Sequence, residues 1–308
     1  MKVSIIGGTG FVGSYLVDKL CADGHEVRVL TRPGSEHRLS SPSGCQAVSG
    51  EVGDEAALRE LLSDAEAAIY LIGILREDPR AGISFDALQR RGAERTIGLA
   101  EELGVGRFLL MSANGVDAAA TPYQTTKLAA EERLRQSSLN WTIFRPSVIF
   151  GDPRGRMEFC SQLKAELIDS PLPAPLFFPG FSPLGAGSFR LGPVHVEDVA
   201  AAFAAALANP DSGGQTYHLC GPQALTWKEI LQAIAAAAGK SKLMLPAPAI
   251  LIAPVAGLLG RFSWFPVTRD QLSMLLAGNT CSDDGLARLG LSAQRFDQST
   301  LAYLGGPA

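Results

Sequence analysis

The sequence has no strong excess of charge of either sign and no cysteine spacing typical of a metal site. Its 27 Lys and Arg and 31 Asp and Glu give a net charge of −4, which indicates no nucleic-acid partner. The five cysteines are scattered and odd in number, so we expect reduced thiols, as in a cytoplasmic protein. They are Cys21, Cys45, Cys160, Cys220 and Cys281. No Cys/His set has metal-ligand spacing, and no metal is expected.

Long uninterrupted hydrophobic runs are also lacking. The most apolar stretch, residues 243–259, contains three prolines and is shorter than the roughly 20 residues that a membrane-spanning helix needs. We expect a buried or substrate-lining helix there. The alternative is a peripheral membrane contact through residues 243–265, because the segment ends in a mixture suited to an interface: Arg261, Phe262, Trp264 and Phe265. The chain enters a strand at once, and we expect no signal peptide.

The first 17 residues, MKVSIIGGTGFVGSYLV, predict a buried strand, a glycine turn and the start of a helix. Gly7 would permit the tight turn, Gly10 the approach of a pyrophosphate, and Gly13 close packing of the helix on the strand. Phosphates would lie at the helix N-terminus, where free N–H groups and the helix dipole favour negative charge. The strand–turn–helix context favours a dinucleotide site over a purely structural turn. The residues expected to contact the nucleotide here are Gly7, Thr9, Gly10, Phe11, Val12 and Gly13.

The residues after the second predicted strand, 26–30, bear on the choice of cofactor. An NAD-specific site usually places Asp or Glu here, whereas this chain has Arg32. An arginine forms charge-assisted hydrogen bonds to a 2′-phosphate, and Arg38 could assist. The sequence therefore predicts a preference for NADP(H). NAD(H), with Arg32 merely solvated, is the alternative.

The first half of the chain alternates between strands and helices. Further strands are predicted at residues 46–49, 67–72, 107–111 and 141–144, with helices beginning after Asp54, near residue 84 and after Thr121. This alternation predicts an α/β fold, a Rossmann-type doubly wound parallel sheet over residues 1–150. Ligands gather at the carboxyl ends of such strands, so we expect further nucleotide contacts from Glu51, Val52, Ile72 and Gly73.

Beyond residue 151 this regularity fails. Residues 168–193 are rich in Pro and Gly and predict a loop over the site. Helices are expected over 196–207 and after capping-box patterns that begin at Thr226 and Thr268. Residues 151–308 are expected to form a smaller, mixed region, partly interleaved with the Rossmann core, that supplies a small-molecule substrate pocket. No motif there identifies the substrate.

Four patterns occur in order along the whole chain: the glycine turn, Tyr123-x-x-x-Lys127, Arg145-Pro146-Ser147-x-x-Phe150-Gly151, and PVHVEDVA at residues 193–200. Together they resemble the extended and atypical short-chain dehydrogenase/reductases, including the nucleoside-sugar epimerase-like branch. Within that group, Arg32 and the short gap before Tyr123 resemble the nucleotide-binding accessory subunit of respiratory complex I and its bacterial relatives. This resemblance adds a respiratory-complex contact through residues 243–265 as a possible partner.

The resemblance implies a catalytic tyrosine and lysine, Tyr123 and Lys127, which lie four residues apart on one helix face. Tyrosine has a pKa of about 10, and a lysine one turn away would lower it so that the phenol acts as general acid or base. Lys127 would also hold the nicotinamide ribose. The third catalytic position, usually Ser or Thr, falls at Ser112, with Ala113 and Asn114 as the alternatives.

The resemblance also places Pro146, Ser147 and Val148 along the nicotinamide and Glu51 near the adenine amino group. His195 is expected to be a buried junction residue rather than a catalytic one, since no acid or nucleophile is spaced with it.

We therefore expect an NADPH-dependent oxidoreductase that acts on a carbonyl, quinone or nucleotide-sugar-like substrate. The first alternative is a non-catalytic assembly or sensor protein that binds NADPH. The second is a nucleoside-diphosphate-sugar epimerase. The residues alone leave turnover and oligomeric state open.

Overall fold

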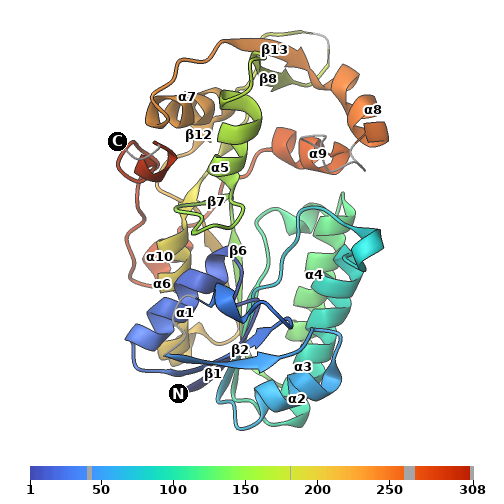
Figure 1. Cartoon of the computed structure of the whole chain (residues 1–308), viewed down its shortest axis with the longest axis vertical. Helices are drawn as coiled ribbons and strands as arrows, with labels where there is room; N and C mark the ends of the chain where they lie inside the picture. The colour runs from blue at the N-terminus through green and yellow to red at the C-terminus, as the bar shows by residue number, and fades with distance from the viewer. Residues whose placement is uncertain (40–43, 181, 260–267, 306–308) are drawn as a thin grey trace. The chain divides into compact units, whose positions relative to one another are not determined.

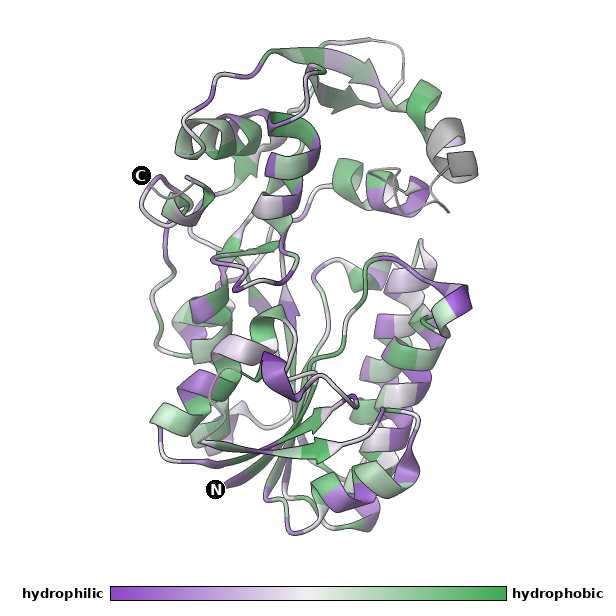
Figure 2. Ribbon diagram, viewed as in Figure 1, coloured by the Kyte–Doolittle hydropathy of each residue, from purple (hydrophilic) through white to green (hydrophobic). Residues whose placement is uncertain are grey.

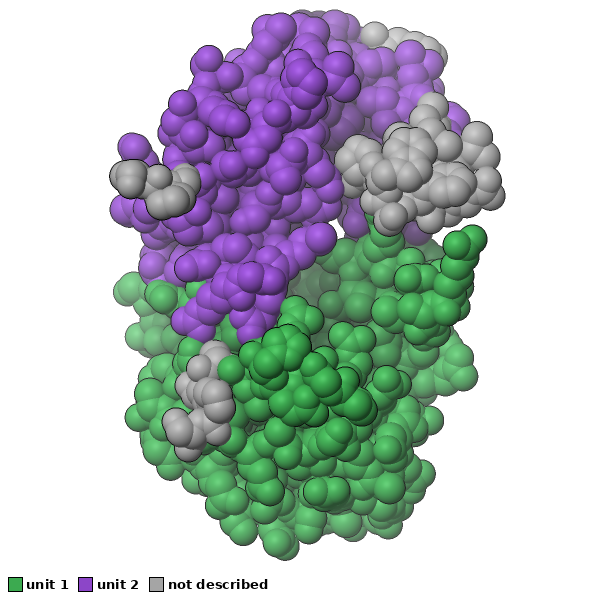
Figure 3. All heavy atoms as spheres, in the orientation of Figure 1, with its two compact units in different colours: residues 1–146, 196–219, 283–292 green, residues 147–195, 220–282, 293–308 purple. Residues whose placement is uncertain are grey.

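The computed structural model describes residues 1–39, 44–180, 182–259 and 268–305 (Figure 1). The chain forms two compact units, each assembled from three stretches of sequence (Figure 3). Unit 1 comprises residues 1–146, 196–219 and 283–292. Unit 2 comprises residues 147–195, 220–282 and 293–308.

Unit 1 is built on a seven-stranded parallel sheet with the order β11-β6-β5-β4-β1-β2-β3. The strand order reverses between β1 and β4, which confirms the predicted doubly wound fold and marks the point where ligands bind in such sheets. Hydrophobic residues dominate the central strands (Figure 2), as expected of strands covered on both faces. The strands are β1 Lys2–Ile6, β2 Glu26–Thr31, β3 Cys45–Ser49, β4 Ala67–Tyr70, β5 Arg107–Met111, β6 Asn140–Pro146 and β11 Gln215–Leu219.

Two groups of helices cover the sheet. α2 (Glu55–Leu62), α3 (Gly92–Glu102) and α4 (Pro122–Arg135) lie on one face, and α1 (Phe11–Ala22) and α6 (Val196–Ala208) pack together on the other (Figure 1). Local chemistry sets the starts of two of these helices. The Asp54 side chain accepts a hydrogen bond from the Ala57 N–H, and Thr121 accepts one from Gln124 with Pro122 in the first turn, both as predicted. The short α10 (Gly285–Arg288) packs near β11.

The helix predicted from about residue 84 is not regular throughout. Its first part, η3 (Asp86–Arg91), has π-helical hydrogen bonds, and regular α-helix begins only at Gly92. A β-carbon at Gly92 would lie 2.6 Å from the Tyr70 hydroxyl and 2.9 Å from a methyl carbon of Val52. The change in helix type therefore occurs where the helix passes very close to the sheet.

Among its described residues, unit 2 contains four α-helices and three two-stranded sheets. β13 (Met244–Pro248) pairs in parallel with β8 (Ala174–Phe178), β10 (Val194–His195) with β7 (Ile149–Phe150), and β12 (Leu225–Thr226) antiparallel with β9 (Arg190–Leu191). The helices are α5 (Phe159–Leu163), α7 (Trp227–Ala237), α8 (Ala249–Leu259) and α9 (Arg269–Ala277). Both predicted capping boxes are formed, Thr226 with Glu229 and Thr268 with Gln271.

Two sequence predictions in this unit are wrong. The Pro-rich region 168–193, whose composition predicts a loop, contains β8 and β9. The stretch 243–259, predicted as one helix, begins as β13 and turns helical only at Ala249, after the last of its closely spaced prolines, Pro248. Proline is tolerated in β8 and β13 because a two-stranded sheet has only edge strands. The residues Arg261, Phe262, Trp264 and Phe265 lie outside the described part of the chain.

The expectation of five reduced thiols is also wrong. Cys220 and Cys281 form a disulfide within unit 2, with a Cα–Cα distance of 5.9 Å. The two residues are 61 positions apart, so no local spacing could reveal the pair. Their proximity depends on tertiary structure, which brings the segment after β11 alongside the segment after α9. Cys21, Cys45 and Cys160 remain free thiols.

The glycine turn provides a test of the close packing in unit 1. A β-carbon at Gly13 would lie 2.2 Å from the Gly7 carbonyl oxygen and 2.6 Å from the Gly8 Cα, both backbone atoms that cannot rotate away. We expect Gly13→Ala to lower the free energy of unfolding by at least about 2 kcal/mol, measured by urea unfolding.

Gly98→Ala, inside α3, is the matched control because a β-carbon there would lie 4.0 Å from its nearest neighbour, the Arg133 guanidinium. There the substitution should be neutral or stabilise the protein by up to about 1 kcal/mol. Equal unfolding midpoints for the two variants would contradict the close-packing role of Gly13.

Candidate nucleotide-binding and active site

The glycine turn has the geometry that a phosphate site requires. Gly7 has φ +95°, a conformation that only glycine adopts readily, and its carbonyl accepts the Gly10 N–H. Gly10 precedes α1 in extended conformation without any side-chain cap, and the first turn of α1 contains no acidic residue. The first-turn N–H groups are therefore not used by a capping side chain, and no carboxylate repels an anion.

The turn contains a fourth glycine, Gly8, which lies outside the spacing of Gly7, Gly10 and Gly13. A β-carbon at Gly8 would lie 2.6 Å from a methyl carbon of Val29 on β2. The Gly7-Gly8 pair alone could have raised this possibility, but the contact with β2 depends on the packed sheet. Gly8 therefore keeps the turn close to the neighbouring strand.

The residues predicted to hold the adenosine end lie where strands of unit 1 end. Arg32 is exposed and directly follows Thr31, the last residue of β2, and Arg38 is exposed at the end of the turn η1 (Glu36–Arg38). Glu51 is exposed just beyond β3, and Val52 beside it is buried. Ile72 and Gly73 follow β4. The parallel sheet thus brings these positions to its carboxyl end.

Lys127 is the most constrained of the predicted catalytic residues. Its side chain is buried, and its ammonium donates hydrogen bonds to the carbonyls of Ile72 (2.9 Å) and Met111 (2.8 Å), just beyond β4 and at the end of β5. Burial lowers the pKa of this ammonium to about 8, while the carboxylate of Glu131 acts in the opposite direction. A β-carbon at Gly73 would lie 3.4 Å from Nζ, so the backbone there runs directly past the ammonium.

Tyr123 lies one turn before Lys127 on α4. Its ring packs edge-to-face on Phe85, with centroids 5.9 Å apart. Burial raises the pKa of Tyr123 to about 12, which is the opposite of the lowering that we expected from the neighbouring lysine. The Lys127 ammonium is turned to two strand-end carbonyls instead. Tyr123 therefore holds its proton at neutral pH.

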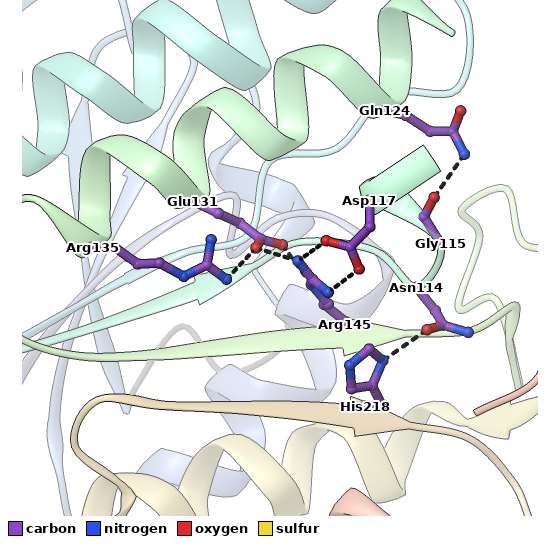
Figure 4. Close-up of polar contacts among 8 residues, drawn as sticks. All are labelled: Asn114, Gly115, Asp117, Gln124, Glu131, Arg135, Arg145 and His218. Carbon is purple, nitrogen blue, oxygen red and sulfur yellow. Dashed lines mark hydrogen bonds and ion pairs between the residues drawn. The ribbon is translucent and has the colours of Figure 1, made fainter. Parts of the chain in front are cut away.

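The structure distinguishes the three candidates for the third catalytic position. Ser112 is buried, and its hydroxyl has no hydrogen-bond partner among the described residues. The Asn114 side-chain oxygen lies 2.8 Å from Nδ1 of His218 on β11 (Figure 4), and Ala113 has no polar side chain. A buried hydroxyl without a partner is uncommon and suits a group that meets a ligand. The catalytic role of Ser112 stays a prediction.

An ion-pair network centred on two buried side chains, Arg145 and Glu131, supports α4 and was not expected from the sequence. The Arg145 guanidinium, on β6, binds both oxygens of Asp117 (2.6 and 2.8 Å) and both of Glu131 (2.9 and 2.7 Å), as Figure 4 shows. Arg135 binds Glu131 as well, at 2.7 Å. The network links β6, α4 and the turn η4 (Val116–Ala118) that leads toward Tyr123. Two signals could have found it: an arginine in an apolar strand, and Glu131 four residues after Lys127.

Pro146 ends the first of the three stretches that form unit 1, whereas Ser147 and Val148 belong to unit 2. The Ser147 hydroxyl donates to the Asn279 carbonyl (2.8 Å), and the Val148 carbonyl accepts the Val194 N–H (3.0 Å). Their place beside the nicotinamide stays a prediction. His195 is buried at the end of β10, with its ring against Phe150 and Nδ1 at 3.0 Å from the Gln294 amide, the environment of a junction residue.

The residues present fit a nicotinamide dinucleotide. The uncapped helix start, the backbone approach at Gly13 and the Ser112 hydroxyl all lie at or near the carboxyl end of the parallel sheet. Fold and site together define a Rossmann-type dinucleotide-binding protein with a Tyr-x-x-x-Lys pair.

Comparison with known proteins defines the class further. The model of the NAD(P)H-binding family matches residues 7–167, more than half of the chain, and the protein belongs to this family. The ceramide reductase of Caulobacter vibrioides is 30% identical over 253 residues, which cover 82% of this chain and 75% of the relative. The chain is also similar to the mitochondrial NADH dehydrogenase (ubiquinone) 1 alpha subcomplex subunit 9 of Arabidopsis thaliana, with 31% identity over 74% of this chain and 56% of that protein. The expected resemblance is thereby confirmed.

Among solved structures, the UDP-glucose 4-epimerase of Thermus thermophilus, in complex with NAD, superposes with a TM-score of 0.74. The alignment covers 99% of this chain and 97% of the epimerase, at 21% identity. At this identity the likeness shows the fold.

The buried ammonium of Lys127 predicts a specific pH dependence of stability. Its pKa is about 8 in the folded protein and 10.5 ordinarily, so between these values the unfolded chain binds more protons. The cost of burying the charge is present in full below pH 8 and disappears as the pH rises to 10.5. Relative to Lys127→Met, the wild type should gain about 3 kcal/mol of unfolding free energy across this window.

Urea unfolding without nucleotide at half-unit pH intervals measures this difference. Lys19→Met, at an exposed lysine of α1, is the control and should follow the wild type throughout. A constant difference between the wild type and Lys127→Met from pH 8 to 10.5 would show that Lys127 is not a buried cation.

Proposed function

We propose that the protein is an NADPH-dependent reductase of a carbonyl compound. The observation that carries this proposal is a set of three polar groups: a protonated phenol at Tyr123, a buried ammonium at Lys127, and a buried hydroxyl at Ser112 that has no partner in the part of the chain that the structure describes. Lys127 binds the carbonyl of Met111, the residue directly before Ser112, so α4 and the end of β5 are held together at this point.

When bound, the reduced nicotinamide supplies a hydride to the carbonyl carbon. The Ser112 hydroxyl would donate a hydrogen bond to the carbonyl oxygen and hold the substrate in place. The Tyr123 phenol would give its proton to that oxygen as negative charge develops, forming the alcohol. The positive charge of Lys127 would stabilise the phenolate that remains after the proton has left. Lys127 would also hold the nicotinamide ribose.

The preference for NADPH rests on Arg32. Its exposed side chain follows β2, where a 2′-phosphate would lie in a Rossmann site, and no ion pair joins it to a carboxylate of the described residues. A guanidinium without an acidic partner is available for a phosphate.

The substrate class is drawn from the relatives. The Caulobacter relative is named a ceramide reductase and another relative, from Xenophilus azovorans, an NAD(P)H azoreductase, so reductases recur among similar proteins. For this chain we propose a carbonyl or quinone substrate, with a nucleotide-sugar-like compound as the further option.

A second candidate function is that of a nucleotide-holding subunit without turnover. It is favoured by the hydrogen bonds that tie the Lys127 ammonium to two carbonyls and by the similarity to NADH dehydrogenase subunits of Arabidopsis and Neurospora crassa. An epimerase is the third option, supported by the fold that this chain shares with solved epimerase structures. Nucleotide that stays bound through purification without turnover would favour the second or third candidate.

Calorimetric titration with NADPH and NADH tests the cofactor assignment. We expect NADPH to bind more tightly, and Arg32→Ala to remove most of that advantage by weakening NADPH about tenfold or more while leaving NADH almost unchanged. Lys19→Ala, which removes a positive charge from the far end of α1, should leave both affinities as they are. If NADPH shows no advantage, or keeps it in Arg32→Ala, the phosphate assignment is wrong.

The role of Tyr123 is tested by Tyr123→Phe in assays of NADPH oxidation with a panel of aldehydes, ketones and quinones. Loss of the proton donor should lower kcat about 10²–10⁴-fold, while NADPH affinity stays within a few-fold. Tyr217→Phe, which removes a buried phenol hydroxyl on β11 but keeps the ring stacked on Phe144, is the control and should retain activity. Unchanged turnover in Tyr123→Phe would remove this residue from the mechanism.

A further inference from the structure

One stretch of unit 2 differs from the rest of the chain in charge. Between Glu229 and Asp270 there is no acidic residue, whereas the same stretch contains Lys240, Lys242, Arg261 and Arg269. The chain as a whole carries a net charge of −4. This local excess of basic residues surrounds the most apolar part of the sequence, residues 243–259.

The described part of this stretch exposes large aliphatic side chains. Leu243 and Leu245 are 66% and 48% exposed, and two positions apart on an extended segment they point to the same side. Ile250 and Leu251, in the first turn of α8, are 46% and 66% exposed, and Figure 2 shows that turn as hydrophobic. We call these four residues the apolar face. The four residues fall within nine consecutive positions of the chain, and exposed apolar side chains that gather in one region mark interaction sites.

Two features restrict what can cover the apolar face. β13 belongs to a two-stranded sheet, but Pro246 and Pro248 lack the N–H groups that an added strand would need. α8 has 11 residues and a length of about 16 Å, about half of the hydrocarbon thickness of a bilayer. Among the described residues no helix is long and apolar enough to cross a membrane. The face therefore suits a contact that lies along a surface.

The charges beside the apolar face indicate the sign of that surface. Lys164 and Lys240 share a single carboxylate, Asp169, at 2.8 and 2.7 Å. The Lys242 ammonium donates to the carbonyls of Ile168 and Ser170, which carry no charge. Glu166 on the same segment accepts a hydrogen bond from the Gln162 amide. Three ammonium groups thus face two carboxylates, and a net positive charge remains.

We propose that the apolar face and its lysines bind the surface of an anionic lipid bilayer. The four aliphatic side chains would enter the boundary between headgroups and acyl chains, and the lysines would lie at the level of the lipid phosphates. The proposal goes beyond the nucleotide chemistry, because all the residues that carry it belong to unit 2.

Vesicle sedimentation of the full chain tests this. Wild-type protein should bind vesicles of 7:3 phosphatidylcholine and phosphatidylglycerol and bind pure phosphatidylcholine at least about tenfold more weakly. A variant with Leu243→Gln, Leu245→Gln, Ile250→Gln and Leu251→Gln should lose at least about tenfold in affinity for the anionic vesicles. Leu184→Gln, at a 90% exposed leucine elsewhere in unit 2, is the matched control and should bind as the wild type does.

NADPH affinity is measured on the same samples as a control for the fold of unit 1. If the fourfold variant loses lipid binding but keeps its NADPH affinity, the loss is due to the apolar face and leaves the proposed function untouched. Circular dichroism melting verifies that the fourfold variant is folded. Three results would overturn the proposal: no binding of wild type to anionic vesicles, equal loss in Leu184→Gln, or a lipid-free dimer that the fourfold variant converts to monomer, which would assign the face to a second copy of the chain.

Discussion

The two hydrogen bonds of the buried Lys127 ammonium hold the candidate site together. They join α4 to the chain just after β4 and to the end of β5, where the carbonyls of Ile72 and Met111 are directed at the ammonium. Gly73 and Ser112 are the next residues along the chain at these two points, so the same contact places a predicted nucleotide contact and a catalytic candidate. A buried charge is costly unless it is hydrogen-bonded, and burial lowers the pKa of this one to about 8.

The surrounding ion pairs explain how α4 tolerates that charge. Glu131, fully buried one turn beyond Lys127, raises the lysine pKa against the effect of burial, and Arg145 and Arg135 neutralise Glu131 in turn. Removing Arg145 would leave the buried Glu131 carboxylate with fewer partners, which costs far more than a lost surface pair. The position of Tyr123 therefore depends on residues of β6 and η4 as well as on its own helix.

The features that sequence could predict are those set by local chemistry. The separate roles of Gly7 and Gly13 follow from their spacing, and the caps at Asp54 and Thr121 need only the neighbouring residues. The features that could not be predicted depend on residues distant in the chain. Arg145 finds Asp117 and Glu131 only when β6 packs against α4, and Cys220 meets Cys281 across 61 residues. The partnerless state of the Ser112 hydroxyl among the described residues is likewise a property of the packed interior.

Proton affinities at the site bear on the direction of the proposed chemistry. With a pKa of about 12, only about one Tyr123 in 10⁵ is ionised at pH 7. Oxidation of an alcohol needs a base at this position, and it is also the first step of an epimerase that works through its nicotinamide. Only the small ionised fraction of Tyr123 could act as that base. Reduction needs an acid, and Tyr123 is already in its acid form. An oxidised nicotinamide, which an epimerase would hold before it oxidises its substrate, would carry a positive charge and would lower the tyrosine pKa for that step. In the nucleotide-free chain, Tyr123 is therefore in the acid form that the proposed reductase requires, whereas an epimerase would depend on its oxidised nucleotide to lower the tyrosine pKa.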